Sequence, residues 1–205
     1  MNVARILYPI EVLGPGKRLG IWLVGCHRQC PECSNPELWE EKSYYEVNLQ
    51  DFIKMIVPIL SQRHVDGIII TGGEPFNQVE ELVVLLKVLE KYTDDIMVYT
   101  GYTLDELKEA NTSTIECLNH IGVLIDGPYI NKLNNGAVMR GSANQKIHIL
   151  KKSLKTKYKV YLSSYKNSIQ NFMTQDGLVS VGIHKRNFKE DLIEKSRKKG
   201  VIFND

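Results

Sequence analysis

Three cysteines lie close together in one short stretch of the chain. Cys26, Cys30 and Cys33 have the spacing C-x3-C-x2-C, and the whole chain of 205 residues has only four cysteines. Three thiolates on one loop can bind three corners of a cubic iron–sulfur cluster, although such a cluster usually takes four cysteines. The spacing therefore predicts a 4Fe-4S cluster with one iron left open. An open iron allows a cluster to contact a substrate or a cofactor directly.

A structural zinc site is the alternative for these cysteines. Zinc sites are typically closed by four Cys or His ligands, often as two separated pairs. The chain has no second pair, and His27 adjoins Cys26, a poor position for binding the same tetrahedral ion. Cys117 lies far along the chain in a short helical pattern, so we expect a buried, inert thiol there. A zinc-stabilised interaction module remains the non-enzymatic alternative.

Two adjacent glycines are the second chemical feature. Gly72 and Gly73 follow a short apolar segment within the sequence TGGEP at residues 71–75. Residues without a Cβ atom allow positive φ values and the close approach of a ligand to the backbone. A tight turn is the ordinary explanation of such a pair. The cysteine loop in the same chain favours a ligand contact instead.

The segments that must position these residues alternate between strands and helices. Strands are predicted at 3–12, 19–24, 67–70, 96–100 and 123–126, and helices at 49–62, 77–91, 104–110 and 115–120. This alternation predicts parallel βαβ units, whose ligands bind beyond the carboxyl ends of the strands. The cysteine loop at 25–36, the glycine pair, Thr100 and Asp126 all follow strands. We therefore expect them on one face of the sheet.

Composition limits the classes of function. The chain is 43% hydrophobic and 24% charged, as in ordinary globular proteins, and its net charge of +2 is too small to indicate nucleic-acid binding. No apolar run reaches the roughly 20 residues that span a bilayer, and no targeting segment is visible. We therefore expect a cytoplasmic protein with no membrane partner. In that compartment, clustered cysteines favour metal binding over disulfides.

The end of the chain differs in charge from the rest. Residues 151–205 hold 13 of the 26 Lys and Arg residues but only 5 of the 24 Asp and Glu residues. A strand is predicted at 178–183, and a helix at 188–199 with Asn187 as its cap and Gly200 as its end. The sequence alone does not place either element. The basic segment is interpreted as a solvated face, a cover for the mouth of the fold, or a docking element for an acidic partner.

Several motifs together resemble a known family. The cysteine spacing and TGGEP resemble the signatures of radical S-adenosylmethionine enzymes, and CSNPELW at 33–39 is similar to glycyl-radical-enzyme activases. The sequences YTGYTLDEL at 99–107, VLIDGPY at 123–129 and RGSANQ at 140–145 resemble the activating proteins of anaerobic ribonucleoside-triphosphate reductase. The resemblance covers about residues 10 to 150. It departs at Glu32, where many members have an aromatic residue, and in the segment after residue 150, which the short activases lack.

The resemblance implies a fold and a reaction. The fold would be α/β, an open partial (β/α)6 barrel over residues 1–150, with a C-terminal α+β extension at 151–205 packed on it. The reaction would be reductive cleavage of S-adenosylmethionine, giving a radical that takes a hydrogen atom from a glycine of a partner glycyl radical enzyme such as anaerobic ribonucleotide reductase. Flavodoxin or ferredoxin would supply the electron. A radical enzyme that modifies a peptide or a small molecule is the alternative, although the extension has no cysteine for auxiliary clusters.

The resemblance also implies roles for the residues near the cluster. The backbone of Glu32, Cys33 and Ser34 is expected to lie against the adenine of S-adenosylmethionine. Gly72 and Gly73 are expected to contact its methionine moiety.

Other residues keep two interpretations each. Glu74 either accepts a hydrogen bond from the methionine ammonium group or caps the helix that follows. Asp126 meets the ribose or the substrate, or it forms an Asp-Gly turn, and Thr100 is a further candidate of the same kind. Arg140 and Asn144 form either an edge that meets the partner or a solvated face.

Overall fold

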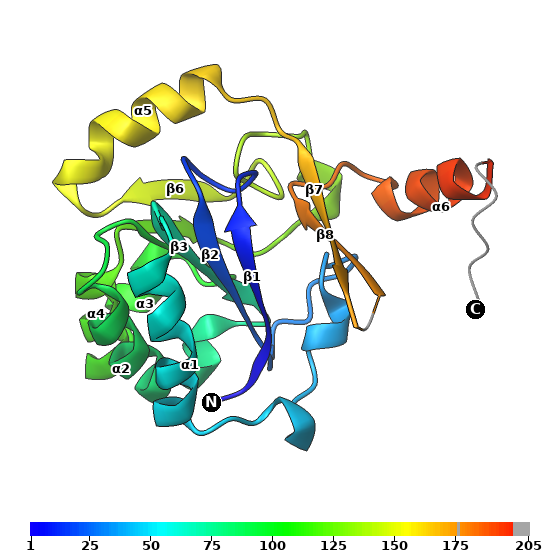
Figure 1. The fold of residues 1–205 in the computed structure, drawn as a ribbon. Coiled ribbons are helices and arrows are strands. Elements are labelled where there is room, and N and C mark those ends of the chain that lie inside the picture. The colour runs from blue at the N-terminus through cyan, green and yellow to red at the C-terminus, as the bar shows by residue number, and fades with distance from the viewer. Residues whose placement is uncertain (176, 199–205) are drawn as a thin grey trace.

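The computed structural model of the chain describes residues 1–175 and 177–198. Six strands form one sheet in chain order (Figure 1): β1 (Val3–Ile10), β2 (Arg18–Leu23), β3 (Gly67–Gly72), β4 (Ile96–Tyr99), β5 (Val123–Asp126) and β6 (Lys146–Ile149). Strands β2 to β5 run parallel, and β1 and β6 run antiparallel to their neighbours at the two edges. The predicted α/β class is confirmed.

The parallel strands are joined by helices that cover one face of the sheet (Figure 1). These helices are α1 (Leu49–Gln62), α2 (Val79–Leu89), α3 (Leu104–Lys108) and α4 (Thr112–His120). Helix α1 begins as predicted, because the Asn48 side chain accepts hydrogen bonds from the amides of Gln50 and Asp51. Apolar side chains of the helices and the sheet, among them Phe52, Ile70 and Leu86, form the larger core between the two layers.

Six βα units were expected, and the described residues contain fewer. The connection from β1 to β2 is too short to hold a crossover helix, so the two strands pair as an antiparallel hairpin. Residues 127–145, which connect β5 to β6, contain only the short 3-10 turn Asn131–Leu133, and these two strands also pair antiparallel. Four parallel strands with two antiparallel edge strands therefore replace six repeated units.

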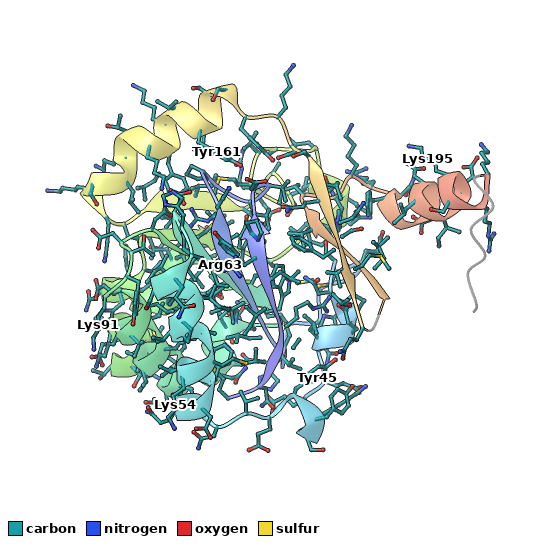
Figure 2. The ribbon with its side chains drawn as sticks, in the orientation of Figure 1. Tyr45, Lys54, Arg63, Lys91, Tyr161 and Lys195 are labelled. Carbon is teal, nitrogen blue, oxygen red and sulfur yellow. The ribbon has the colours of Figure 1, made fainter. Side chains whose placement is uncertain are left out.

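The opposite face of the sheet is covered by the end of the chain. This part contains α5 (Lys155–Ser164), the hairpin of β7 (Ile169–Thr174) and β8 (Gly177–Gly182), and α6 (Phe188–Lys198). Helix α5 lies at the end of the sheet where the parallel strands begin, and α6 points away from the body (Figure 1). Tyr161 points from α5 toward the sheet (Figure 2), and its hydroxyl accepts a hydrogen bond from the amide of Gly14 at 3.1 Å.

A buried ion pair joins α5 to the sheet. The Arg18 side chain is fully buried, and it donates to Asp95 Oδ1 at 2.8 Å. From α5, Tyr158 donates to the same oxygen at 2.6 Å, and Lys157 donates to Asp95 Oδ2 at 2.7 Å. Gly67 leaves the space that Arg18 fills, since a Cβ there would collide with the guanidinium group. Buried charges are tolerated only when they are paired in this way, so α5 is fixed to the sheet.

Two predictions for the end of the chain are confirmed. The strand expected at 178–183 corresponds to β8, and the helix expected from 188 corresponds to α6. Its predicted end at Lys199 and Gly200 lies outside the described residues. Helix α5 and strands β6 and β7 were not predicted. No helix among the described residues is both long enough and apolar enough to cross a membrane.

Candidate functional site

A pocket at the carboxyl ends of the parallel strands brings most of the predicted site residues together. The expected residues that line it are Cys26, Cys30, Cys33, Ser34, Gly72, Gly73, Glu74 and Thr100. Glu32 and Asp126 are not among its lining residues. The expectation that these separate segments meet on one face of the sheet therefore holds for most of them.

The cysteine loop is held by its own ends. The amide of Gly25 donates to the carbonyl of Leu38 at 2.9 Å, and the amide of Cys26 donates to the carbonyl of Trp39 at 2.9 Å. Within the loop, Gln29 and Glu32 have positive φ values of 43° and 58°. Residues in the left-handed conformation tighten the turn of a loop. The thiols of Cys26, Cys30 and Cys33 are all free and partly exposed.

The arrangement of these thiols fits a cluster. No three His, Cys, Asp or Glu side chains among the described residues are close enough to hold a single metal ion. A cubic cluster takes its protein ligands at separate corners, and three thiols on one loop are a donor set of that kind. Burial raises the pKa of Cys33, and the amide of Asn35, which donates to its sulfur at 3.4 Å, acts in the opposite direction. Iron ligation would favour the deprotonated thiol.

Cys117 lies in a different environment, as predicted. It is fully buried in the core between α2 and α4, where its sulfur lies 3.8 Å from the carbonyl oxygen of Val79. Burial raises its pKa to about 12. A thiol that is sealed in the core and held protonated is inert, and Cys117 does not line the pocket.

The glycine pair has a structural reason that the sequence did not reveal. A Cβ on Gly72 would collide with the backbone of Leu23, and a Cβ on Gly73 would lie 2.5 Å from the carbonyl oxygen of Gly25. The amide of Gly73 donates to Leu23 O at 2.8 Å, and the amide of Glu74 donates to Gly25 O at 2.7 Å. The two glycines therefore allow the end of β3 to pack directly on the start of the cysteine loop. Their contact with a cofactor stays a prediction.

Glu74 connects the ends of two strands. Its buried carboxylate accepts hydrogen bonds from the amide of Phe76 at 3.1 Å, the hydroxyl of Thr100 at 2.8 Å and the amide of Gly101 at 2.7 Å. Burial raises the pKa of Glu74, while these three donors lower it. Of its two interpretations, the structure supports capping of the turn that starts at Pro75. Thr100 takes part in the same connection.

The Asp126 carboxylate bonds to the start of α3 and the start of β6, outside the pocket. Its Oδ2 accepts from the amide of Leu104 at 2.7 Å, its Oδ1 accepts from the amide of Lys146 at 3.2 Å, and His148 Nε2 lies 2.9 Å from Oδ2. The following Gly127 has a φ of 99° and lines the pocket itself. The Asp-Gly turn is therefore present, and a cofactor contact by Asp126 stays a prediction.

Comparison with known proteins identifies the family. A family model described as a 4Fe-4S single cluster domain matches residues 12–148. The anaerobic ribonucleoside-triphosphate reductase-activating protein of Salmonella typhi is 34% identical over 151 residues, which cover 70% of this chain and 96% of that protein. The protein of the same name from Escherichia coli (strain K12) is 32% identical over 157 residues, with coverage of 70% and 96%. The chain belongs to the family of anaerobic ribonucleoside-triphosphate reductase-activating proteins.

This family assignment confirms the recognition made from the sequence motifs. The expected 4Fe-4S cofactor is likewise confirmed by the family model, whose matched residues include all three clustered cysteines. Among solved structures, QueE from Escherichia coli is similar over 50% of this chain and 53% of its own chain, with a TM-score of 0.40 and 22% identity.

Arg28 is a residue of this activase-family loop that the sequence analysis missed. It lies between the first two cysteines and lines the pocket. Its guanidinium carbon lies 4.2 Å from the centre of the Tyr102 ring, and its Nη2 donates to both carboxylate oxygens of Glu106 at 3.2 and 3.3 Å. These contacts tie the cysteine loop to α3. The position of Arg28 between two cysteines was the signal in the sequence that could have identified it.

A series of hydrogen bonds runs from Glu32 to His184, just after β8. Asn131 Nδ2 donates to the Glu32 carboxylate, and Asn131 Oδ1 accepts from the Tyr129 hydroxyl at 2.8 Å. Asn134 Nδ2 donates to that hydroxyl at 3.3 Å and to the His184 carbonyl at 2.8 Å. The exposed Glu32 side chain thus couples the cysteine loop to the segment after β8.

Arg140 and Asn144 both make contacts within the loop at 127–145. Arg140 Nη1 donates to the carbonyl of Gln145 at 3.1 Å, and Asn144 Nδ2 donates to the carbonyl of Pro128 at 2.7 Å. Both residues are partly buried. These side chains satisfy backbone carbonyls of a largely irregular loop, and a contact of either residue with the partner stays a prediction.

Proposed function

We propose that this chain is an activase that generates a glycyl radical on anaerobic ribonucleotide reductase. In this proposal it binds one 4Fe-4S cluster through Cys26, Cys30 and Cys33, and it reductively cleaves S-adenosylmethionine. The observation that carries the proposal is that these cysteines and Gly72 and Gly73 line one pocket at the ends of two strands. The relatives named as activating proteins of that reductase support it.

The residues of the pocket fit the two groups. When bound, the cluster and S-adenosylmethionine supply one-electron chemistry that removes a hydrogen atom from a substrate carbon. Three protein thiols leave one coordination position for the cofactor. The backbone at Gly72 and Gly73 and the backbone from Glu32 to Ser34 are the proposed contacts of the methionine and adenine ends.

Polar side chains at the strand ends fix the pocket in this proposal. Glu74 and Thr100 hold the ends of β3 and β4 together by the 2.8 Å hydrogen bond between them. Asp126 holds the start of α3, from which Glu106 reaches Arg28. These residues keep the backbone of the pocket in place, and S-adenosylmethionine then meets preformed groups.

Large apolar side chains that line the same pocket would exclude water from the reaction. Trp22 and Tyr99 line the pocket from the sheet, and Val181 lines it from β8. A dry, enclosed site protects reactive species from side reactions.

We infer that the sheet curves around this pocket as an open partial barrel, with residues 1–150 as the core and 151–205 as an extension packed on it.

We also infer the setting in which this activase works. A clustered set of free thiols is retained for iron in a reducing compartment, which fits the cytoplasm. The cysteine loop is partly exposed, so a flavodoxin or ferredoxin has access for electron transfer. The net charge of +2 is too small to indicate a nucleic-acid partner.

The test is an anaerobic reconstitution. The chain, loaded with iron and sulfide, is expected to bind four irons and to cleave S-adenosylmethionine into methionine and 5′-deoxyadenosine when dithionite is added. With the reductase of the same organism present, electron paramagnetic resonance is expected to detect a glycyl radical on that reductase. Cleavage without a glycyl radical would contradict the choice of partner, and four bound irons without cleavage would contradict the chemistry.

A further inference from the structure

One wall of the pocket comes from β8 and the residues just after it, beyond the segment that the family model matches. Five consecutive residues, 180–184, line the pocket there. A strand that presented only a face would place alternate residues along the pocket. Ser180, Val181 and Gly182 of β8 all line the pocket, so residues of both faces of this strand border it, as they do along a strand edge. A strand edge offers N–H and C=O groups to another extended chain.

This wall is firmly attached to the body. Val181 and Ile183 are 3% and 9% exposed, and both pack in a cluster with Trp22 of β2. The hydrogen bond from Asn134 to the carbonyl of His184 fixes the backbone of His184, the residue after Ile183. The wall thus has an apolar attachment and a polar attachment, and its position relative to the cysteine loop is defined.

His184 carries a polar atom without a partner on this wall. Its Nε2 is buried and has no hydrogen-bond partner in the described part of the chain. The ring stacks on Phe188, with centroids 4.2 Å apart and planes at 3°, so its orientation is held. Burial lowers the pKa of His184 and outweighs an opposing effect from the nearby backbone of Ser180, so the neutral ring is favoured. A buried polar atom is costly unless it is paired, so a bound ligand is the natural source of its partner.

The cofactors are not the expected source of that partner. The family match ends at residue 148, and alignments of 151 and 157 residues already cover 96% of the relatives from Salmonella typhi and Escherichia coli. The groups that hold cofactors common to the family therefore belong to the shared part of the chain. The wall at 180–184 lies outside that shared part.

We propose that β8 and His184 form the docking wall for the glycine-bearing segment of the partner enzyme. The segment runs in extended form along the edge of β8, and a peptide group beside the glycine hydrogen-bonds to His184 Nε2. A glycine has no side chain, which allows close approach between the two backbones. This inference rests on the proposed function, and it makes His184 a specificity residue for the protein substrate.

The test compares three variants of the full-length, cluster-loaded chain. His184→Phe keeps an aromatic ring against Phe188 and removes both ring nitrogens, and His184→Gln restores a hydrogen-bonding group. His64→Phe is the matched control, because its ring is 82% exposed. Glycyl radical formation is measured by electron paramagnetic resonance over a range of concentrations of the reductase from the same organism.

We expect His184→Phe to raise the KM for the reductase by about tenfold, the size of one lost hydrogen bond, with the larger effect on KM than on kcat. His184→Gln should recover most of the difference, and His64→Phe should match the wild type. An unchanged KM in His184→Phe would overturn the inference. A weaker affinity for S-adenosylmethionine without the reductase, measured by equilibrium dialysis, would also overturn it by placing the ring on the cofactor.

Two further outcomes are separated by the same measurements. If His184→Phe does not fold, as judged by circular dichroism, the KM of a folded His184→Leu variant decides the question, because Leu has no hydrogen-bonding group. If the wild type cleaves S-adenosylmethionine but forms no glycyl radical, the proposed function and this inference both fail. A competent wild type with unaffected variants would overturn the inference alone.

Discussion

The four cysteine side chains fall into two kinds according to their burial. Cys26, Cys30 and Cys33 are partly exposed at the pocket, whereas Cys117 is sealed between two helices. We expect single replacement of any of the three by Ala to abolish cluster binding and cleavage of S-adenosylmethionine. Cys117→Ala should keep four irons per chain and lose only about 1 kcal/mol of stability from the small cavity. Iron analysis and thermal melting check both results, and iron loss in Cys117→Ala alone would contradict the ligand assignment.

The glycine pair can be tested by adding one carbon atom. A Cβ on Gly73 would lie 2.5 Å from the carbonyl oxygen of Gly25, just before the first cysteine. We therefore expect Gly73→Ala to displace the cysteine loop and to reduce iron content together with cofactor affinity. Gly136→Ala is the control, since nothing lies within 4 Å of a Cβ there, although its positive φ of 71° adds slight strain. Full iron content in Gly73→Ala with weakened cofactor binding would show that the ligand, and not the loop, requires the glycine.

At the scale of elements, Asp95 joins β2, β4 and α5. Its carboxylate is 2.8 Å from Arg18, 2.7 Å from Lys157 and 2.6 Å from the Tyr158 hydroxyl. Asp95→Asn leaves Arg18 buried without a counter-charge, so we expect a loss of about 3–5 kcal/mol in urea unfolding at pH 7. Asp94→Asn, at a 58% exposed position, is the control, and its loss should stay below about 1 kcal/mol.

The same carboxylate predicts a pH dependence. Burial alone would raise the pKa of Asp95, but its bonds to Arg18, Lys157 and Tyr158 outweigh that effect and lower it from 3.8. A lowered folded pKa contributes stability that is complete above the unfolded pKa and is lost as pH falls through the folded value. The stability difference between the wild type and Asp95→Asn should therefore stay constant above about pH 5 and shrink only below about pH 4. A difference that shrank between pH 7 and pH 5 would contradict this assignment.

Over the whole molecule, part of the charge asymmetry is used internally. Lys151 bonds to Glu90 and to Asp94 at 2.9 Å, and Lys157 bonds to Asp95. Other basic residues of the extension stay exposed on and before α6, which points away from the body, as Lys195 shows in Figure 2. The cover and docking interpretations of this segment are therefore compatible, with α5 and the hairpin covering the sheet and α6 available to a partner.

The docking interpretation predicts an effect of charge reversal. Replacing the exposed residues Lys185, Lys195 and Arg197 by Glu should slow activation of an acidic partner and reduce its dependence on salt, because salt screens such steering over about 10 Å at 0.1 M. Lys199, a further basic residue of this stretch, lies outside the described residues. The readout is the rate of glycyl radical formation at several salt concentrations.

A matched control separates local docking from net charge. Reversing Lys54, Lys91 and Lys108 makes the same change in charge at exposed positions of the helix-covered face, where Figure 2 labels two of them. We expect this control to activate the partner at close to the wild-type rate. An equal loss in both sets would assign the effect to net charge, and no loss in either set would leave the extension with its covering role alone.

Local features of this protein could be predicted from its amino-acid sequence. The C-x3-C-x2-C spacing and the glycine pair indicated the cofactor chemistry, and the periodicity of apolar residues predicted α1 from its first residue to its last. Asp126 and Thr100 were recognisable as turn or strand-end residues. These features depend on neighbours within a few positions of the chain, which is why pattern and spacing suffice for them.

The way in which distant segments share one site depends on tertiary packing. Helix α5 has Lys155, Lys157 and Lys159 at alternate positions, a strand-like pattern, and it is helical because Leu154, Tyr158 and Tyr161 pack together on the sheet. The glycine pair is required by the backbone of Leu23 and Gly25, almost 50 residues earlier in the chain. The place of 180–184 in the wall of the pocket depends on burial against the sheet, which no local spacing encodes. Packing energy is gained between residues far apart in sequence, so it decides the arrangements that local preference leaves open.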